Sequence, residues 1–237
     1  MANSWFQFQQ FRVNQDRCAM KISTDAVMLG ALADASFPRE ILDVGTGTGV
    51  IALMLAQRFS EAKIQAVEID SEAAAQALGN FRANIFSDRM QLWEGRFQDF
   101  QPEQTFDLIV SNPPYFPDHL KSPDAQRNRA LHTDELSFGD LLEKVDVLLK
   151  EDGRFWLILP PRQMQDFQKE AGEKGLFAER KFTLQDRPGK RIQREICAFS
   201  RTQKELETSA IFFKNEDGTP HESYARLVSG FLLGFKA

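Results

Sequence analysis

The sequence has little cysteine and histidine, and it lacks any long apolar run. Its 237 residues include two cysteines, Cys18 and Cys197, which lie in unrelated segments without metal-ligand or redox spacing. We therefore expect buried, reduced thiols and no metal site. No apolar stretch is long enough to cross a membrane, and the aromatic residues near the N-terminus alternate with glutamines rather than forming a signal peptide. These absences predict a soluble, cytoplasmic protein.

Positive charge is also scarce, since the formal net charge is −5. A basic field over the whole molecule is absent, so nucleic-acid binding would need a local patch. The stretch from Arg180 to Arg201 is such a patch, with seven basic residues against Asp186 and Glu195. A charged run is often only a solvated face. Both interpretations stay open from the residues alone.

The order of predicted elements is that of an α/β protein. The N-terminal segment predicts a hairpin or extended arm around the polar turn Asn14-Gln15-Asp16, followed by a helix. Short apolar strands then alternate with amphipathic helices from residue 40 to residue 174, and two consecutive strands follow. This pattern predicts a mostly parallel sheet of seven strands, with helices on both faces and one antiparallel edge strand. We expect one domain over residues 1–237, with an N-terminal extension (1–38), a core (39–203) and a C-terminal extension (204–237).

A glycine-rich turn follows the first strand of the core, in Asp43-Val44-Gly45-Thr46-Gly47-Thr48-Gly49. Closely spaced glycines let a ligand lie against bare main chain at the carboxyl end of a parallel strand. Glu68, at the end of the next strand, can accept hydrogen bonds from ribose hydroxyls. A dinucleotide oxidoreductase would have G-x-G-x-x-G and a pyrophosphate, whereas Asp43 suits a cofactor that carries an ammonium and a sulfonium group.

The combination of Asp43, the three glycines and Glu68 resembles the class I S-adenosylmethionine-dependent methyltransferases, which have a Rossmann-like fold. The resemblance implies S-adenosyl-L-methionine as the cofactor. In that class the adenine of the cofactor often meets an acidic residue after the third strand. This chain has Arg96 there instead, so we expect main-chain contacts around Arg96 and Phe97. Asp70 is as well placed to cap the following helix as to contact the cofactor.

The fourth strand ends in Ser111-Asn112-Pro113-Pro114-Tyr115. An amino nitrogen conjugated to a ring is a poor nucleophile, and the Asn112 side-chain oxygen and the Pro113 carbonyl can accept its two hydrogens. Pro114 stiffens the turn, and Tyr115 offers a ring on which a flipped base stacks. The motif resembles the signature of amino-methyltransferases acting on adenine, guanine or glutamine, so we expect Asn112, Pro113 and Tyr115 to be catalytic.

Further segments resemble the bacterial tRNA(Val) adenine-N6 methyltransferase family over nearly the whole chain. They are Lys21 to Gly30, the glycine-rich turn, Asn112 to Phe116, and Leu131-His132-Thr133-Asp134. The resemblance implies methylation of the adenine 3′ of the anticodon, with tRNA as the partner and no stable protein partner. It also implies that Thr24 and Asp25 meet the methionine end of the cofactor, with a helix cap at Thr24 as the alternative.

The substrate surface is predicted from position. The turn after the sixth strand falls on the active-site side if that strand is parallel to the others, which would place its basic residues near the RNA. The expected RNA-contacting residues are Tyr115, Phe116, Arg187, Lys190, Arg191 and Arg194. Two alternatives remain: a protein-glutamine methyltransferase, which shares N-P-P-Y but has a helical domain ahead of its core, and a non-catalytic RNA-binding module on the same fold.

Overall fold

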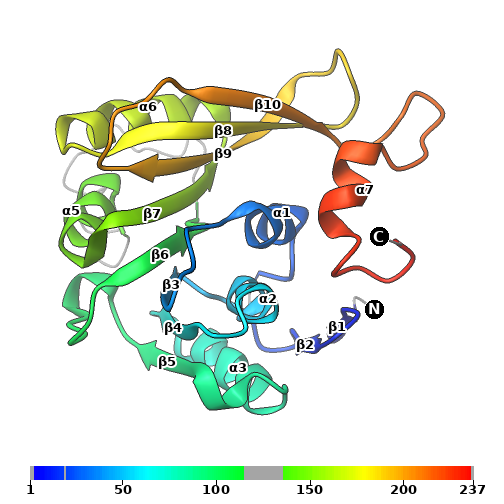
Figure 1. Ribbon diagram of the computed structural model, residues 1–237. Helices are drawn as coiled ribbons and strands as arrows, with labels where there is room; N and C mark the ends of the chain where they lie inside the picture. The colour runs from blue at the N-terminus through cyan, green and yellow to red at the C-terminus, as the bar shows by residue number, and fades with distance from the viewer. Residues whose placement is uncertain (1–2, 19, 115–135, 236–237) are drawn as a thin grey trace, which may run out of the picture.

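The computed structural model describes residues 3–18, 20–114 and 136–235 (Figure 1). Its strands and helices alternate through the core, as the sequence pattern predicts. The strands are β1 (Trp5–Gln7), β2 (Arg12–Asn14), β3 (Glu40–Val44), β4 (Lys63–Glu68), β5 (Met90–Glu94), β6 (Phe106–Ser111), β7 (Leu149–Leu159), β8 (Phe177–Gln185), β9 (Ile192–Ser200) and β10 (Glu207–Phe212). The helices are α1 (Thr24–Leu32), α2 (Val50–Arg58), α3 (Ser71–Arg82), α5 (Phe138–Leu148), α6 (Pro161–Glu173) and α7 (Glu222–Val228), with 3-10 turns η1 (Ser87–Arg89) and η2 (Phe97–Asp99).

The main sheet has eight strands in the order β10-β8-β9-β7-β6-β3-β4-β5. Among the described strands of this sheet, only β9 is antiparallel to its neighbours, β7 and β8, and β10 pairs with β8 in parallel. The prediction of seven strands was therefore one short, and the antiparallel strand lies inside the sheet rather than at its edge. The added strand, β10, is almost wholly exposed, so it has no buried apolar pattern from which to predict it.

Helices cover both faces of the sheet, as predicted (Figure 1). One buried apolar cluster joins α1, α2 and α3 to one face and includes Val228 and Phe231 near the C-terminus. A second cluster joins α5, α6 and η2 to the other face. Because β3 and β6 are buried on both sides, their sequences are nearly continuous apolar runs.

The terminal segments pack together beside α1 and α2. The N-terminal hairpin is present, but its turn spans residues 8–11 rather than the predicted Asn14-Gln15-Asp16, because β1 pairs with β2 from Trp5↔Asn14 to Gln7↔Arg12. The Gln9 side-chain amide donates to the carbonyls of Ser229 (2.7 Å) and Leu232 (2.8 Å). Since β10 belongs to the main sheet, the sheet extends beyond the predicted core boundary at residue 203; the three-part division of the chain stays a prediction.

Candidate active site

The glycine-rich turn is fastened to the end of β4 by main-chain hydrogen bonds. The amides of Gly45 and Thr46 donate to the Val67 carbonyl at 2.9 and 3.1 Å, and the Gly47 amide donates to the Glu68 carboxylate at 2.8 Å. Gly45 and Gly47 have positive φ, and no atom lies within 4 Å of the position a Cβ would take at either residue. The turn therefore has a fixed shape and an open main-chain surface for a ligand.

Gly49 begins the contact between the turn and α3. It caps α2 with a φ of +82°, and a Cβ at this position would lie 2.5 Å from the Phe81 ring. A side chain here would have to displace a buried ring of α3, in a backbone conformation that L-residues rarely adopt. The third glycine of the motif thus sets the approach of α3 to the turn.

Asp43 is completely buried at the end of β3. Its Oδ2 accepts hydrogen bonds from the Thr46 hydroxyl at 2.6 Å and the Ala52 amide at 3.2 Å. Its Oδ1 has no hydrogen-bond partner among the described residues. Burial raises the pKa of Asp43 to about 7, against the lowering effect of those two hydrogen bonds. A buried carboxylate oxygen without a donor is costly, and a cationic ligand nearby would offset that cost.

Glu68 holds two turns with one carboxylate. Besides the Gly47 amide on Oε2, its Oε1 accepts from the amides of Ile69 and Asp70, both at 3.0 Å. The side chain is 8% exposed. A carboxylate accepts about four hydrogen bonds, so room remains for about one more donor. This capacity fits one ribose hydroxyl without loss of a main-chain bond, whereas the sequence prediction had two.

The Asn-Pro-Pro turn leaves the sheet next to the glycine-rich turn. Val44 pairs with Ser111 across β3 and β6, so Gly45 and Asn112 follow adjacent strand ends. The buried Ser111 hydroxyl donates to the Val44 carbonyl at 3.0 Å and ties the two ends together. Asn112 is half-buried and Pro113 is buried. The predicted cofactor and catalytic motifs therefore lie side by side at the carboxyl edge of the sheet.

Other predicted cofactor residues have structural partners. Ser23 rather than Thr24 caps α1, since its hydroxyl accepts from the Ala26 amide, and Thr24 is the first helical residue. Asp70 caps α3 by accepting from the Ala73 amide at 2.8 Å. The Phe97 side chain is buried against Phe100, so at Phe97 only the main chain is available to a ligand. Arg96 is exposed. A cofactor contact at Thr24, Asp70, Arg96 or Phe97 stays a prediction.

Asp25 and Arg194 contact each other, although the sequence assigned them to cofactor and RNA. The Arg194 Nε lies 2.7 Å from Asp25 Oδ2. The pair joins the start of α1 to the start of β9. The basic turn leads directly into this part of β9, which therefore lies beside Thr24 and Asp25, the predicted methionine-binding motif. A single side chain can therefore influence both surfaces.

Most basic residues of the predicted patch pair with acids, some inside the 180–201 stretch and others elsewhere in the chain. Arg180 pairs with Asp34, and Lys181 pairs with Glu195 at 3.2 Å. The remaining pairs are Arg187 with Asp186 at 3.2 Å, and Arg201 with Asp146 at 2.5 Å. Lys190 and Arg191 are exposed, and neither forms an ion pair within the described part of the chain.

The basic turn lies at the predicted edge. The chain directions β6∥β7, β7 against β9, and β9 against β8 place the end of β8 at the same edge as the end of β6. Residues 186–191 follow β8 there. Tyr115 and Phe116 lie outside the described residues, so their predicted roles in catalysis and stacking are untested.

Residues 3–18, 20–114 and 136–235 contain no group of three or more His, Cys, Asp or Glu side chains arranged to hold a metal ion. No helix in these ranges is long and apolar enough to cross a bilayer. The predictions of no metal, no protein partner and a cytoplasmic location remain expectations.

Comparison with known proteins now adds to this geometry. The sequence model of the family described as "Methyltransferase small domain" matches residues 21–168. The chain belongs to this family. Two relatives named tRNA1(Val) (adenine(37)-N6)-methyltransferase are similar to this methyltransferase. The Pedobacter heparinus protein is 41% identical over 230 residues (97% of this chain, 98% of its own), and the Parabacteroides distasonis protein is 46% identical over 203 residues (84% and 85%).

Solved structures support the fold of the methyltransferase. A predicted O-methyltransferase from Agrobacterium tumefaciens aligns with a TM-score of 0.68 at 20% identity, covering 87% of this chain and 96% of that one. The glycopeptide N-methyltransferase MtfA in complex with S-adenosylmethionine aligns with a TM-score of 0.53 at 12% identity, covering 76% and 87%. The fold is that of the class I methyltransferases, and the predicted fold class is confirmed.

The residues of the carboxyl edge fit S-adenosylmethionine, the cofactor of this methyltransferase. When bound, the cofactor supplies an electrophilic methyl group on a sulfonium. Asp43 has an unpartnered carboxylate oxygen for the positive end, and Glu68 retains an acceptor site for a ribose hydroxyl. Gly45 and Gly47 leave the main chain open between them. The groups available at this edge of the sheet therefore match the positive charge and the hydroxyl groups of the cofactor.

Several positioning residues escaped the sequence analysis. The Thr46 hydroxyl donates to Asp43, and the Ser111 hydroxyl joins the two turns. Asn80, buried on α3, donates to the Thr48 carbonyl at 2.8 Å and also holds Asn14 in β2. A polar residue on the apolar face of a helix is the available signal for Asn80. The hydroxyl contacts of Thr46 and Ser111 have no comparable signal in the sequence.

Proposed function

We propose that this methyltransferase transfers the methyl group of S-adenosylmethionine to the exocyclic N6 of an adenine in tRNA, the adenine 3′ of the anticodon of tRNA(Val). The observation that carries the proposal is the pairing of Val44 with Ser111, which sets Gly45 and Asn112 at adjacent strand ends. A nitrogen held at Asn112 is then next to the cofactor turn. The names of the similar relatives supply the substrate.

The main task of the protein in this reaction is to orient the adenine amino group toward the methyl group. The adenine amino group has a delocalised lone pair, so it reacts only when its hydrogens are bound and the lone pair faces the methyl group. The Asn112 side-chain oxygen and the Pro113 carbonyl are the proposed acceptors. Ser111 positions both, because its hydroxyl fixes the end of β6 to β3. Proximity and orientation supply most of the rate, without a covalent intermediate.

The RNA backbone would meet the turn between β8 and β9. Lys190 and Arg191 are exposed at the edge of the sheet that also bears Asn112, and phosphate contacts position RNA without reading its sequence. The Arg194 guanidinium pairs with Asp25, so an effect of Arg194 on the RNA would also involve the start of α1.

The test is incubation of the purified protein with methyl-labelled cofactor and total tRNA, followed by nucleoside analysis. We expect label in N6-methyladenosine, concentrated in tRNA(Val). Label in a glutamine of a co-incubated release factor would establish the rival enzyme. Cofactor binding by calorimetry without any methyl transfer would instead support the non-catalytic RNA-binding module.

A further inference from the structure

The N-terminal hairpin presents an aromatic ring to solvent. Trp5 is 42% exposed, and the Arg12 guanidinium lies 4.3 Å from the centre of its ring. Trp5 pairs with Asn14 across the hairpin, so the two side chains project from the same face, whereas Val13 on the opposite face is fully buried. The hairpin is thus anchored by one face and leaves Trp5, braced by Arg12, on the other.

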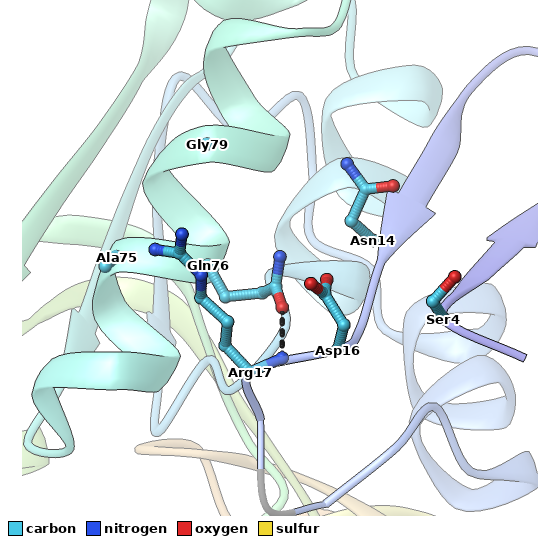
Figure 2. A pocket seen from close by; sticks show the side chains of 7 residues that line it. All are labelled: Ser4, Asn14, Asp16, Arg17, Ala75, Gln76 and Gly79. Atoms are coloured by element: carbon cyan, nitrogen blue, oxygen red, sulfur yellow. Dashed lines mark hydrogen bonds between the residues drawn. The ribbon is translucent and has the colours of Figure 1, made fainter. Parts of the chain in front are cut away.

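A pocket of about 410 Å³ lies between this hairpin and α3 (Figure 2). Its polar lining residues are Ser4, Asn14, Asp16, Arg17 and Gln76. Figure 2 shows the Asn14 amide, the Asp16 carboxylate and the Gln76 amide directed into the space between β2 and α3. The side chains of Asn14, Asp16 and Arg17 form no hydrogen bond or ion pair within the ranges that the structure describes.

The pocket has a fixed frame. Asn80 binds both the amide and the carbonyl of Asn14 at 2.8 Å, and Gln76 accepts from the Arg17 amide at 2.7 Å. The main chain of this segment is therefore satisfied by α3, and its side chains stay available to a ligand. Asn80 also holds Thr48, so the pocket is tied directly to the glycine-rich turn.

We propose that the hairpin and this pocket bind two adjoining unpaired nucleotides of the RNA substrate, one base on Trp5 and the next nucleotide in the pocket. The inference rests on the proposed function, since it extends the RNA surface of the same enzyme. Aromatic rings backed by arginine are platforms for unstacked bases, and amide and carboxylate groups bind base edges.

Charge supports this occupant. The segment from residue 3 to residue 22 contains three basic residues, Arg12, Arg17 and Lys21, against the single acid Asp16, in a chain of net charge −5. A positive hairpin on an acidic protein favours a polyanion. The single carboxylate, Asp16, lies among amides, where it can accept from a base amino group or a 2′-hydroxyl rather than face a phosphate.

The chain allows a direct test, because its three tryptophans differ in exposure. Trp156 is fully buried and Trp5 is exposed. We expect titration with an anticodon stem-loop RNA to quench intrinsic fluorescence in the wild type. Trp5→Phe should remove most of that quenching while RNA affinity stays within about twofold, because a phenyl ring still stacks. Trp5→Ala should weaken RNA binding about tenfold, a loss within the usual range for one stacked base.

Arg17→Ala tests the pocket separately and should weaken RNA binding several-fold. Phe37→Ala is the matched control, because Phe37 is a 94% exposed aromatic residue that precedes the opposite, amino end of β3. Cofactor affinity by calorimetry should be unchanged in every variant. Wild-type RNA affinity in both Trp5→Ala and Arg17→Ala, with quenching retained in Trp5→Phe, would overturn the proposal.

The two proposals fail differently. If the wild type forms N6-methyladenosine in tRNA while the hairpin variants bind and methylate it normally, only the hairpin site is wrong. If the wild type neither binds nor methylates tRNA, the proposed function is wrong and the hairpin proposal falls with it.

Discussion

The cofactor side and the proposed RNA-binding side of this enzyme are built differently. At the ends of β3 and β4, the glycine-rich turn is held by main-chain donors and by the carboxylates of Asp43 and Glu68. At the end of β8 and along the hairpin, the candidate RNA-binding side chains project from well-fixed main chain into solvent, as Lys190, Arg191 and Arg17 do. A cofactor of constant shape suits a site fixed by its own hydrogen bonds. A large polyanion suits separate side chains whose contacts form on binding.

The comparison predicts that damage on the cofactor side is large and local, whereas damage on the RNA side is small and depends on salt. The strongest test is between the two sides, at Asn112. Asn112→Ala should reduce the single-turnover rate about 100-fold, because misplacing the reacting nitrogen is that costly, with cofactor affinity nearly intact. Asn112→Asp is the matched variant that keeps the side-chain size. A wild-type rate in the alanine variant would remove Asn112 from the reaction.

On the cofactor side, Glu68→Ala should weaken S-adenosylmethionine binding by about 1–3 kcal/mol, measured by calorimetry. The variant loses a ribose acceptor and also the support of the Gly47 amide. Glu68→Gln separates the two effects, since it keeps one acceptor oxygen but not the charge, and we expect an intermediate loss. Unchanged affinity in both variants would exclude Glu68 from the cofactor site.

Asp43 links cofactor binding to pH. Burial raises its pKa to about 7, so lowering the pH from 8 to 6 neutralises the carboxylate and should weaken cofactor binding about tenfold. The stability effect has the opposite sign: the folded state holds a proton that the unfolded state releases above its ordinary pKa of 3.8, so this contribution to stability declines as the pH rises toward 7.

Asp43→Asn tests both effects at once. The variant should bind cofactor weakly at either pH, by calorimetry. Its Tm should fall less than the wild-type Tm between pH 5 and pH 8, because the titrating group is gone. An unchanged wild-type pH profile in the asparagine variant would assign the titration to another group.

The smallest effect is expected at the basic turn. Lys190→Ala combined with Arg191→Ala should raise the KM for tRNA several-fold and leave cofactor binding alone. The slope of log affinity against log salt should shrink by about 0.7 for each lost contact to single-stranded RNA. Lys63→Ala is a suitable control, since Lys63 is exposed at the amino end of β4, on the far edge of the sheet. Equal slopes in all variants would mean that the turn is only solvated surface.

How far the sequence leads depends on whether a contact is local. Three motifs can be recognised from a few consecutive residues: the glycine-rich turn, the end of β4 and the Asn-Pro-Pro turn. The fold brings them together because parallel strands end at one edge. The basic stretch was different. Its charge was counted along the chain, but Arg180 and Arg194 are paired with Asp34 and Asp25, which no local pattern could reveal.

The misplaced features have a similar cause. β9 lies between β7 and β8 and is antiparallel to both, so β8 has the same direction as the core strands. The pairing of the strands shows this order, and no local sequence pattern predicts it. The hairpin turn was assigned to the polar Asn14-Gln15-Asp16, yet the Asn14 main chain is bound by the Asn80 side chain, and the Gln15 side chain accepts from the Ile22 amide. A segment whose composition is typical of a turn is therefore held by residues outside it.

The two ends of the chain meet at Gln9. Its main-chain amide donates to the Phe231 carbonyl, and its side chain binds the carbonyls of Ser229 and Leu232. During translation Gln9 is made 220 residues before Ser229, so its bonds to the C-terminal segment form late. The bonds between the hairpin and α3 can form much earlier, because Asn80 and Gln76 are made long before residue 229. A premature stop near residue 225 would leave the catalytic motifs and these bonds to α3 in place, and would remove every acceptor that Gln9 finds in the C-terminal segment.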